Sequence, residues 1–512
     1  MVAADCHDVN TTSGLVKGFE TKSGDIYVYK NVPYAKPPVG DLRFELPEQL
    51  DTLQEVKSSL SPIYCPQHSS HYTRIKNSTF GQEDCLYLDI YASKTKTSQS
   101  LPVLIYFHPG RFSYGSKEEF RGDFLLNYNE IIVVIPNYRL GILGFLRGNL
   151  GLFDQRMAMQ WVWENIPSFG GDRGRITIAG HDAGGAAVGL HVLSARSHDS
   201  GVDDPFLSSS PQKLYEEGRQ KNVSYLIGIS KDEAFVEVET EFPTAVKTQH
   251  LDMIIQHFLK PYLLNSPNLQ HTVTAVKYHY LRGVPVPAFE SIIPQMIRML
   301  SDYLYNTPAQ ISLKLHGQKA SNTFMYVFSD KNRAKSPNYY TSFEYTKNHL
   351  GRIHLGDAPY VFKTSFLEDL KVSNHRTKSL CSIWGEFIKK NALSIYNWKK
   401  FNKEEMNYMD ISETVTSQVD YRKKDIELWT VLIPELQNIV ENLSTVAPQR
   451  VFLEPNSAAW GAAGLSVLLG VLCVALIGVV VVTRKELTQS SIIPINSNTY
   501  KDQVKYNNIE LE

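Results

Sequence analysis

Residues 176–190 read ITIAGHDAGGAAVGL and join an apolar run to a segment of small residues through Gly-His-Asp-Ala-Gly-Gly. A buried strand, a tight turn and a helix in this order form a nucleophile elbow, which holds its central residue exposed at the head of the helix. Glycines on both sides of that residue leave room for the backbone to reverse. The central residue is Asp182, so this elbow presents a carboxylate.

Further apolar runs lie on both sides of the elbow. The longest ones are Val103–Phe107, Ile131–Pro136, Ile176–Ala179, Tyr225–Ile229 and Thr323–Phe328. Runs without polar alternation are typical of strands buried on both faces of a mainly parallel sheet. Shorter β-like runs precede them at Ile26–Tyr29 and Leu86–Tyr91, and Arg156–Asn165 has helical spacing. This alternation predicts an α/β fold for residues 1–443.

Composition limits the possible functions. The chain has 512 residues, 43% of them hydrophobic, and a formal net charge of -1, so it can bury a large core but has no basic excess. We therefore expect no nucleic-acid partner. No spacing typical of metal ligands stands out, and we expect neither a metal nor a cofactor.

The C-terminal region predicts a membrane anchor. Gly461–Val482 is apolar and uncharged, long enough as a helix to cross a hydrocarbon core of roughly 30 Å. A buried core helix would be shorter and amphipathic. Arg484 and Lys485 follow the span, so the positive-inside rule places the polar tail, 483–512, in the cytoplasm. Residues 444–460 then form a short stalk.

This orientation predicts a single-pass type I protein of the plasma membrane with residues 1–443 outside the cell. Sequons at Asn10, Asn77, Asn222 and Asn442 favour that side. An extracellular domain is expected to carry a secretory signal, and Met1–Asn10 contains no apolar segment. We interpret the start as incomplete or alternative.

Long motifs around the elbow resemble those of one enzyme family. They are NVPYAKPPVGDLRF (31–44), EDCLYLDIY (83–91), LPVLIYFHPGRF (101–112), NYRLGILGFL (137–146) and GNLGLFDQRMAMQWVWENIPSFGGD (148–172). In this order they resemble the type-B carboxylesterase and cholinesterase family over most of residues 13–440. The resemblance implies an α/β-hydrolase fold with a mixed, mostly parallel central sheet and helices on both faces. It also implies ion pairs Arg43–Glu83 and Arg139–Asp154, and a disulfide between Cys65 and Cys85.

The family's catalytic triad of Ser, Glu and His maps onto Asp182, Glu233 and His354. A carboxylate cannot take the serine's role in ordinary ester hydrolysis, because its attack gives an anhydride and its charge repels the developing oxyanion. Loss of a triad nucleophile costs on the order of a million-fold in turnover. We interpret the retained Glu233 and His354 as inherited scaffold.

The oxyanion hole also departs from the family. Where the family has His-Gly-Gly-Gly, this chain has His108, Pro109, Gly110 and Arg111. The backbone N–H groups of Gly110, Arg111 and Ala183 are candidates to point into the site. One hypothesis pairs the Arg111 guanidinium with Asp182 and plugs the site; the alternative leaves Arg111 in solvent.

Two further departures bear on function. Ile75 stands where the cholinesterases place a choline-binding tryptophan, which argues against choline esters. Family members also have a longer stretch between elbow and triad glutamate, with a core strand after the elbow helix, whereas the region 195–212 is short here. Loss of that strand predicts a gap in the sheet. A spliced form, an incorrect gene model or a reduced domain would each give this sequence.

Two functions compete. The neuroligins, gliotactin, glutactin and neurotactin resemble esterases, lack the working triad and act by binding partners; a broken elbow beside a single span fits that layout and an extracellular protein partner. The alternative is a hydrolase with Asp182 as nucleophile, as in epoxide hydrolases, or a residual carboxylesterase. Residues Ile426–Leu443 are a candidate homodimer interface by the same resemblance, and packing within the monomer accounts for them equally well.

Overall fold

The computed structural model describes residues 7–445 except 22–23, 53–55, 57–58, 69–78, 95–98, 199–204, 242–250, 264–268, 284–288, 321, 331–351 and 365–372. Ile75, Asn77 and the expected span 461–482 lie outside the described residues, as does most of the expected stalk. Within the described ranges, no helix combines the length and apolar character needed to cross a bilayer.

The first sheet contains the N-terminal strands and the strand that leads to the elbow. Its order is β11 (Gly171–Gly180), β8 (Leu101–Phe107), β10 (Ile132–Pro136), β7 (Tyr87–Ser93), β4 (Ile26–Pro33) and β3 (Phe19–Glu20). Strands β11, β8 and β10 are parallel, and the pairings from β10 to β7, β4 and β3 are antiparallel. The expected mostly parallel sheet therefore holds only around the elbow, and the N-terminal half is antiparallel.

Helices cover both faces of this sheet because its central strands are apolar on both sides. Along β8, Leu104 and Tyr106 belong to the core under α1 (Asp123–Tyr128), α12 (Ala358–Val361) and α13 (Asn374–Lys390). The alternate residues, Val103, Ile105 and Phe107, pack with α3 (Leu150–Asn165) on the other face. This alternation is the expected pattern for a strand with two buried faces.

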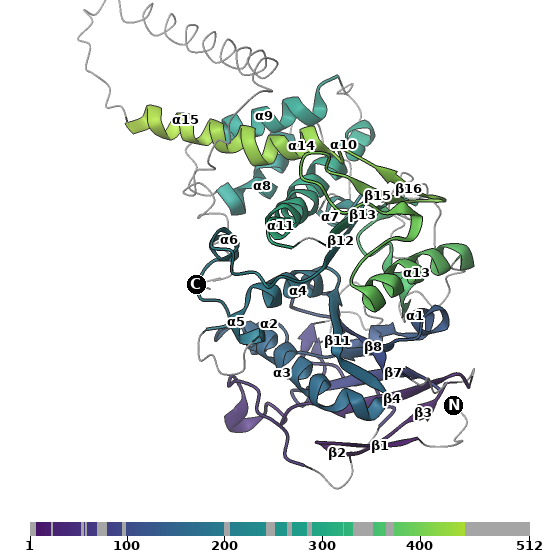
Figure 1. The fold of residues 1–512 in the computed structure, drawn as a ribbon. Coiled ribbons are helices and arrows are strands. Elements are labelled where there is room, and N and C mark those ends of the chain that lie inside the picture. The colour runs from purple at the N-terminus through teal and green to yellow at the C-terminus, as the bar shows by residue number, and fades with distance from the viewer. Residues whose placement is uncertain are drawn as a thin grey trace, which may run out of the picture.

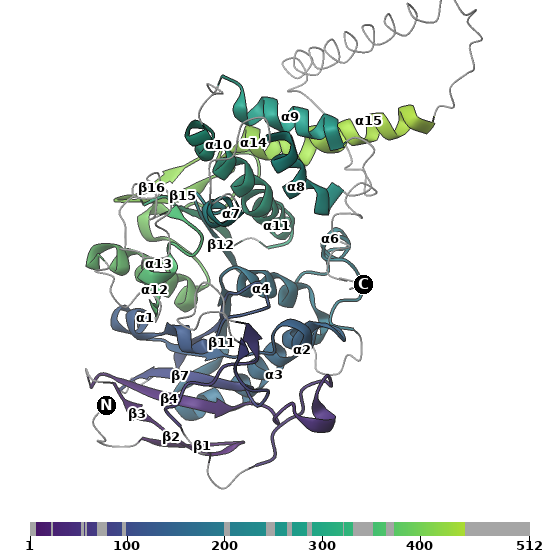
Figure 2. The same ribbon diagram turned by 180° about the vertical axis from the view of Figure 1, so that it is seen from behind.

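A second, separate sheet carries the C-terminal strands. Its order is β12 (Tyr225–Ser230), β13 (Thr323–Phe328), β15 (Tyr408–Ile411) and β16 (Val415–Gln418), parallel except for the β15–β16 hairpin. Among the described strands, β12 does not pair with β11. Helix α4 (Ala183–Leu193) follows β11 directly and packs against β11 and β8 (Figures 1 and 2). The two sheets still share one core, in which Phe324 and Phe328 pack with residues of α13.

A group of helices forms the end of the molecule that lies at the top of Figure 1. They are α7 (Phe235–Glu241), α8 (Leu251–Leu263), α9 (Leu269–Leu281), α10 (Phe289–Ser301), α11 (Thr307–Gly317), α14 (Lys423–Glu427) and α15 (Ile433–Thr445). The apolar faces of α7, α8, α9 and α10 form a core of their own, and Trp429 and Ile433 pack into it at the start of α15. Farther along, α15 runs outward from the body in both views, and Ile439 is 49% exposed.

Short elements complete the described chain. They are β1 (Asp8–Thr11), β2 (Gly14–Lys17), β5 (Gln67–His68), β6 (Thr79–Phe80), β9 (Phe120–Arg121), β14 (Lys363–Thr364), α2 (Gly141–Phe145), α5 (Ala195–His198) and α6 (Pro211–Glu216).

The covalent and ionic links implied by the resemblance are present. Cys65 and Cys85 form a disulfide. Asp154 is buried and accepts two hydrogen bonds from the Arg139 guanidinium, at 2.8 and 2.7 Å. The Arg43–Glu83 pair, at 2.6 Å, lies nearer the surface. The buried pair fixes the chain before α3, while the exposed pair contributes little to stability.

Candidate functional site

The elbow backbone is strained in the way the sequence predicts. Asp182 precedes α4 with φ 51° and ψ -122°, a conformation that costs energy for any residue with a side chain. Two glycines make the turn possible. A Cβ at Gly180 would overlap the backbone of Gly184, and a Cβ at Gly184 would overlap the carbonyl group of Phe107 in β8. The glycines thus let α4 approach the sheet closely and hold Asp182 at the helix head.

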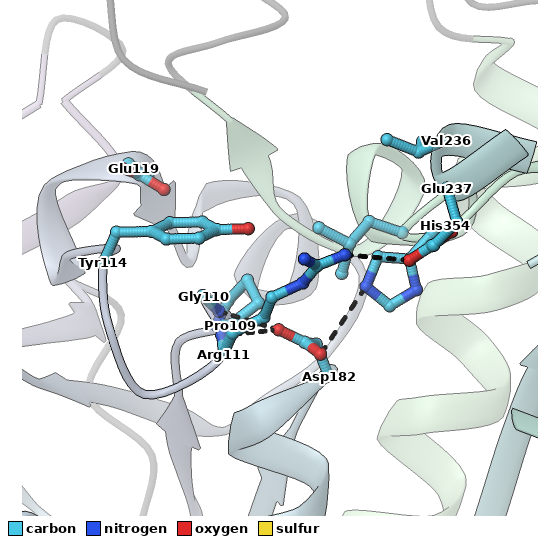
Figure 3. A pocket seen from close by; sticks show the side chains of 10 residues that line it. Pro109, Gly110, Arg111, Tyr114, Glu119, Asp182, Val236, Glu237 and His354 are labelled. Atoms are coloured by element: carbon cyan, nitrogen blue, oxygen red, sulfur yellow. Dashed lines mark hydrogen bonds and ion pairs between the residues drawn. The ribbon is translucent and has the colours of Figure 1, made fainter. Parts of the chain in front are cut away.

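The oxyanion loop points its N–H groups inward, toward the protein's own carboxylate. The backbone N–H groups of Gly110 and Arg111 each donate to Oδ2 of Asp182 at 2.9 Å. The N–H of Ala183 also donates to this side chain. All three candidate oxyanion donors therefore converge, as the sequence predicts, and the anion that they bind is Asp182 (Figure 3).

His354 lies between two carboxylates. Its Nδ1 is 2.7 Å from Oε2 of Glu233, and its Nε2 is 3.8 Å from Oδ1 of Asp182. Glu233 is held in turn by the backbone N–H of Ser230, at the end of β12, at 2.6 Å. The structure thus brings together the three residues that the sequence comparison placed in a triad.

The charges in this group differ from those of a working triad. Burial alone would lower the pKa of His354, but the hydrogen bond that it donates to Glu233 and the charges of Glu233, Asp182 and Glu237 raise it to about 9. Burial would raise the pKa of Asp182, yet the His354 charge and the three backbone donors hold it below its ordinary value. At neutral pH the site is therefore an imidazolium between carboxylates, and a protonated His354 cannot accept a proton as a general base.

The Arg111 side chain corrects the plug hypothesis. Its Nη2 is 2.9 Å from Oε1 of Glu237 on α7, so its ionic partner is Glu237 and not Asp182. Glu237 also accepts a hydrogen bond from the Tyr305 hydroxyl at 2.6 Å. In Figure 3 the guanidinium reaches over Asp182 toward Glu237, so the pair links the oxyanion loop to α7 above the site. Arg111 contributes its backbone N–H to Asp182 and its side chain to this bridge.

Sequence reasoning missed Glu237 and Tyr305, because their place in the site depends on how α7 packs. The only signal in the sequence was the position of Glu237 four residues after Glu233, one helical turn on.

Little room is left above the elbow. The pocket bounded by Asp182, His354, Arg111 and Glu237 measures about 20 Å³, enough for one or two water molecules. Glu119 lies at its other side (Figure 3), where burial raises the pKa of this carboxyl group to about 8. A neutral Glu119 adds no further negative charge at pH 7. An acyl group of ordinary size does not fit this pocket.

A second polar network, centred on His181 and Asp357, holds the elbow in place. His181, the residue before Asp182, places Nε2 3.1 Å from Oδ1 of Asp357 and Nδ1 3.0 Å from the Tyr106 hydroxyl. The Tyr326 hydroxyl donates to Asp357 at 2.6 Å. The His181 ring also stacks on Trp384 of α13. The elbow is thus tied to β8, β13 and α13 without the help of Asp182.

Three of the four expected glycosylation sites lie in the described residues. Asn10 on β1 and Asn222 before β12 are exposed, as a glycan requires. Asn442 lies on α15. For metal binding, the described ranges hold no group of three His, Cys, Asp or Glu side chains suited to an ion.

Comparison with known proteins identifies relatives over the whole described chain. A sequence model of the carboxylesterase family matches residues 5–201 and 198–429. Mouse (Mus musculus) neuroligin-2 is 24% identical over 604 aligned positions that cover 88% of this chain and 70% of that protein. Liver carboxylesterase B-1 of Rattus norvegicus is 25% identical over 549 positions, covering 84% and 94%. Juvenile hormone esterase of Tribolium castaneum is 42% identical over 178 residues, 33% of this chain and 30% of that protein.

These alignments also locate the difference in length. The alignment with neuroligin-2 spans 604 positions, more than the 512 residues of the whole chain, so the relative has residues that this chain lacks. The family match divides into two parts that meet at residues 198–201, just after α4. This is the interval in which the sequence appeared shortened.

Proposed function

We propose, on the premise that this chain belongs to the carboxylesterase family, that it is an esterase-like cell-surface binding protein that does not hydrolyse esters. One observation carries the proposal. The backbone donors of Gly110 and Arg111 are already bound to the carboxylate of Asp182, at 2.9 Å each. A substrate's oxyanion would have to displace this anion and then develop its own negative charge beside it.

The charge of His354 argues in the same direction. Its pKa of about 9 keeps it protonated at neutral pH, because carboxylates flank it on both sides. Both the serine-type mechanism and the alternative with Asp182 as nucleophile need a neutral histidine to activate water. The Asp182 alternative is disfavoured for this reason.

Turnover assays test the catalytic part of the proposal. The purified full chain is offered p-nitrophenyl butyrate and styrene oxide, beside Asp182→Ala and a double variant, Asp182→Ser with Arg111→Gly. We expect wild type and Asp182→Ala to be equally silent on both substrates. The double variant, with the donors freed and one carboxylate removed, should gain measurable ester hydrolysis and so show that the assay works. Turnover by wild type that Asp182→Ala abolishes would establish a hydrolase instead.

We further propose a type I arrangement in the plasma membrane, with residues 1–443 outside, 461–482 in contact with lipid and 483–512 inside. The exposed positions of Asn10 and Asn222 support an outside location for the folded part. Cells expressing the full chain test this. Treatment with an N-glycosidase should increase its gel mobility, and Asn222→Gln should remove part of that change. Mobility that the enzyme leaves unchanged would contradict the orientation.

The partner is expected to be an extracellular protein, since neuroligin-2 stands among the relatives and the oxyanion donors are occupied by Asp182. A homodimer through α15 is part of the proposal. The exposed Ile439 on the projecting part of α15 supports it. An Ile439→Lys variant should lower the mass measured by light scattering if this helix pairs, and an unchanged mass would remove the dimer from the proposal.

A further inference from the structure

The two sheets face each other with unpaired edges. In the described chain, β11 ends the order of the first sheet and β12 ends that of the second. Between them lies a cavity of about 1200 Å³, lined by β11, β12, α4 and α13. Edge strands carry backbone N–H and C=O groups that have no ladder partner, and leaving such groups inside an apolar cavity costs free energy.

Burial along the strands shows the same interruption. In β8, which is paired on both sides, residues 102–107 are all buried. Residues 175–180 of β11 are only partly buried although they belong to the middle of the fold, and Gly228 of β12 is exposed. The inner edges of both strands therefore have the surroundings of a sheet that lacks one strand.

The direction of the two edges follows from the site. The carboxyl end of β11 leads to Asp182, and the carboxyl end of β12 leads to Glu233. Because His354 lies between these two carboxylates, the carboxyl ends of both strands lie at the same site. The gap therefore has a polarity: a strand that paired with both edges in parallel would direct its C-terminal end toward Asp182.

The walls define what would fit. Apolar side chains such as Ile176, Ile178, Val188 and Phe387 line the cavity, and its lining carboxyl groups, Asp182, Glu233 and Asp357, lie together with His181 and His354 at the end next to the site. We propose that the gap binds one extended, uncharged, apolar segment of another polypeptide as a parallel strand between β11 and β12. Six residues, the length of β12, would extend about 20 Å at the strand rise of 3.3 Å per residue.

A strand is favoured over a small apolar ligand because only a strand satisfies the two rows of backbone groups. Main-chain hydrogen bonds would supply affinity, and apolar side chains on both faces would supply selectivity, as in other cases of strand addition. The proposal does not depend on whether the site above the gap is catalytic.

Binding of synthetic peptides to the purified full chain tests the proposal. The probes are two fluorescent peptides with N-terminal lysines for solubility, one carrying Ile131–Ile135 and the other Thr323–Phe328, both buried-strand sequences of this protein. Each is compared with a version N-methylated at alternate residues, which keeps the side chains and removes backbone donors. We expect saturable binding that N-methylation weakens at least about tenfold, the equivalent of one or two lost hydrogen bonds.

Hydrogen exchange supplies a second measurement on wild type alone. Bound peptide should slow amide exchange in both 176–180 and 225–230, because both edges gain partners. Protection of neither strand, or the absence of saturable binding by both peptides, would overturn the proposal. Equal binding of the N-methylated peptides, or their displacement by palmitate, would assign the cavity to small apolar ligands. Self-association that peptide reverses would make a second copy the occupant.

Gly189 on α4 offers a matched pair of variants. Nothing lies closer than 3.8 Å to a Cβ at this position, where the nearest atom is the Tyr225 hydroxyl, and Gly189 lines the cavity. Gly189→Phe should block the gap and abolish peptide binding, whereas Gly189→Ala should keep it. Unchanged binding by a folded Gly189→Phe would contradict the proposal. If that variant does not fold, the hydrogen-exchange measurement on wild type tests the proposal instead.

Discussion

The two sides of the site have diverged to different degrees. On the elbow side, the loop carries Pro109 and Arg111, and a carboxylate stands where the family resemblance places a serine. On the other side, the Glu233–His354 hydrogen bond is intact at 2.7 Å. Nevertheless the unchanged side carries a cation at neutral pH, because Glu233 first, and then Asp182 and Glu237, raise the pKa of His354 to about 9. Preserved geometry therefore does not imply preserved reactivity.

The elbow shows the converse case, in which the central residue has changed but the backbone conformation is kept. Its backbone keeps the strained conformation and the inward N–H groups although its central residue is Asp182. Glycine contacts with β8 and the His181–Asp357 network fix that conformation independently of the central side chain. Contacts with the rest of the fold therefore set the backbone conformation of the elbow, whereas nearby carboxylates set the charge of His354.

Among the tests of this contrast, the removal of His354 should have the largest effect on stability. His354→Ala leaves Asp182 and Glu233 as buried carboxylates without their cation, and we expect a loss of roughly 3–5 kcal/mol in the free energy of unfolding. Urea denaturation at neutral pH measures it. Glu83→Ala, which breaks the exposed pair with Arg43, is the control and should cost no more than about 1 kcal/mol. Equal costs for the two variants would mean that the imidazolium does not hold the site together.

The next effect is a dependence on pH. The folded pKa of His354, about 9, exceeds its ordinary value of 6.5. Its contribution to stability is therefore complete below pH 6.5 and is lost as the pH rises through about 9, a change of roughly 3 kcal/mol. Unfolding free energies of wild type and His354→Gln, measured across this range, should converge at high pH. A constant difference would contradict the raised pKa.

The contribution of Asp182 to stability changes with pH in the opposite direction. Its pKa is held below the ordinary value, so its contribution is complete above that value and is lost as the pH falls. The same titration, extended to acid and compared with Asp182→Asn, separates the two groups.

A smaller effect tests the elbow backbone. A Cβ at Gly184 would overlap the backbone at the end of β8, so Gly184→Ala should cost roughly 1–3 kcal/mol. Gly189→Ala lies five residues along the same helix in open space and should stabilise by roughly 0.5–1 kcal/mol. Thermal melts of both variants would check the pair. A neutral Gly184→Ala would show that contact with β8 does not fix the elbow.

The smallest effect concerns the bridge above the site. The Arg111 side chain is 62% exposed, so its pairing with Glu237 should contribute only about 0.2–1 kcal/mol. A double-mutant cycle with Arg111→Gln and Glu237→Gln measures that coupling. The corresponding cycle with Asp182→Asn should give less. A larger coupling to Asp182 would restore the plug hypothesis.

The sequence predicted the features that depend on local pattern. Apolar runs predicted the central strands, and the Gly-rich turn predicted the elbow, whereas the family resemblance made the N–H groups of Gly110 and Arg111 candidates for the site. The strands Tyr408–Ile411 and Val415–Gln418 were missed, because each has only four residues and the second is mostly polar. The resemblance implied a mixed sheet, but not which strands are antiparallel, since the pattern of apolar residues alone does not give strand direction.

What the sequence could not give depends on distant residues meeting. The packing of α7 decides the partner of Arg111. It brings Glu237 next to the oxyanion loop, which lies more than a hundred residues earlier in the chain. The charge of His354 depends on three carboxylates from two distant segments, Asp182 at the elbow and Glu233 and Glu237 after β12. The shortened stretch after α4 did suggest a gap in the sheet, yet only the structure gives its size, its two edges and its direction.

The carboxylate of Asp182, bound by the oxyanion donors, resembles a reaction product that is never released. Reagents that report on serine hydrolases, such as fluorophosphonates, need both a nucleophilic oxygen and vacant donors for the phosphoryl group. In this protein the same side chain withholds both. We expect the chain to escape surveys of hydrolases based on covalent labelling, and cells exposed to organophosphates to retain it unmodified.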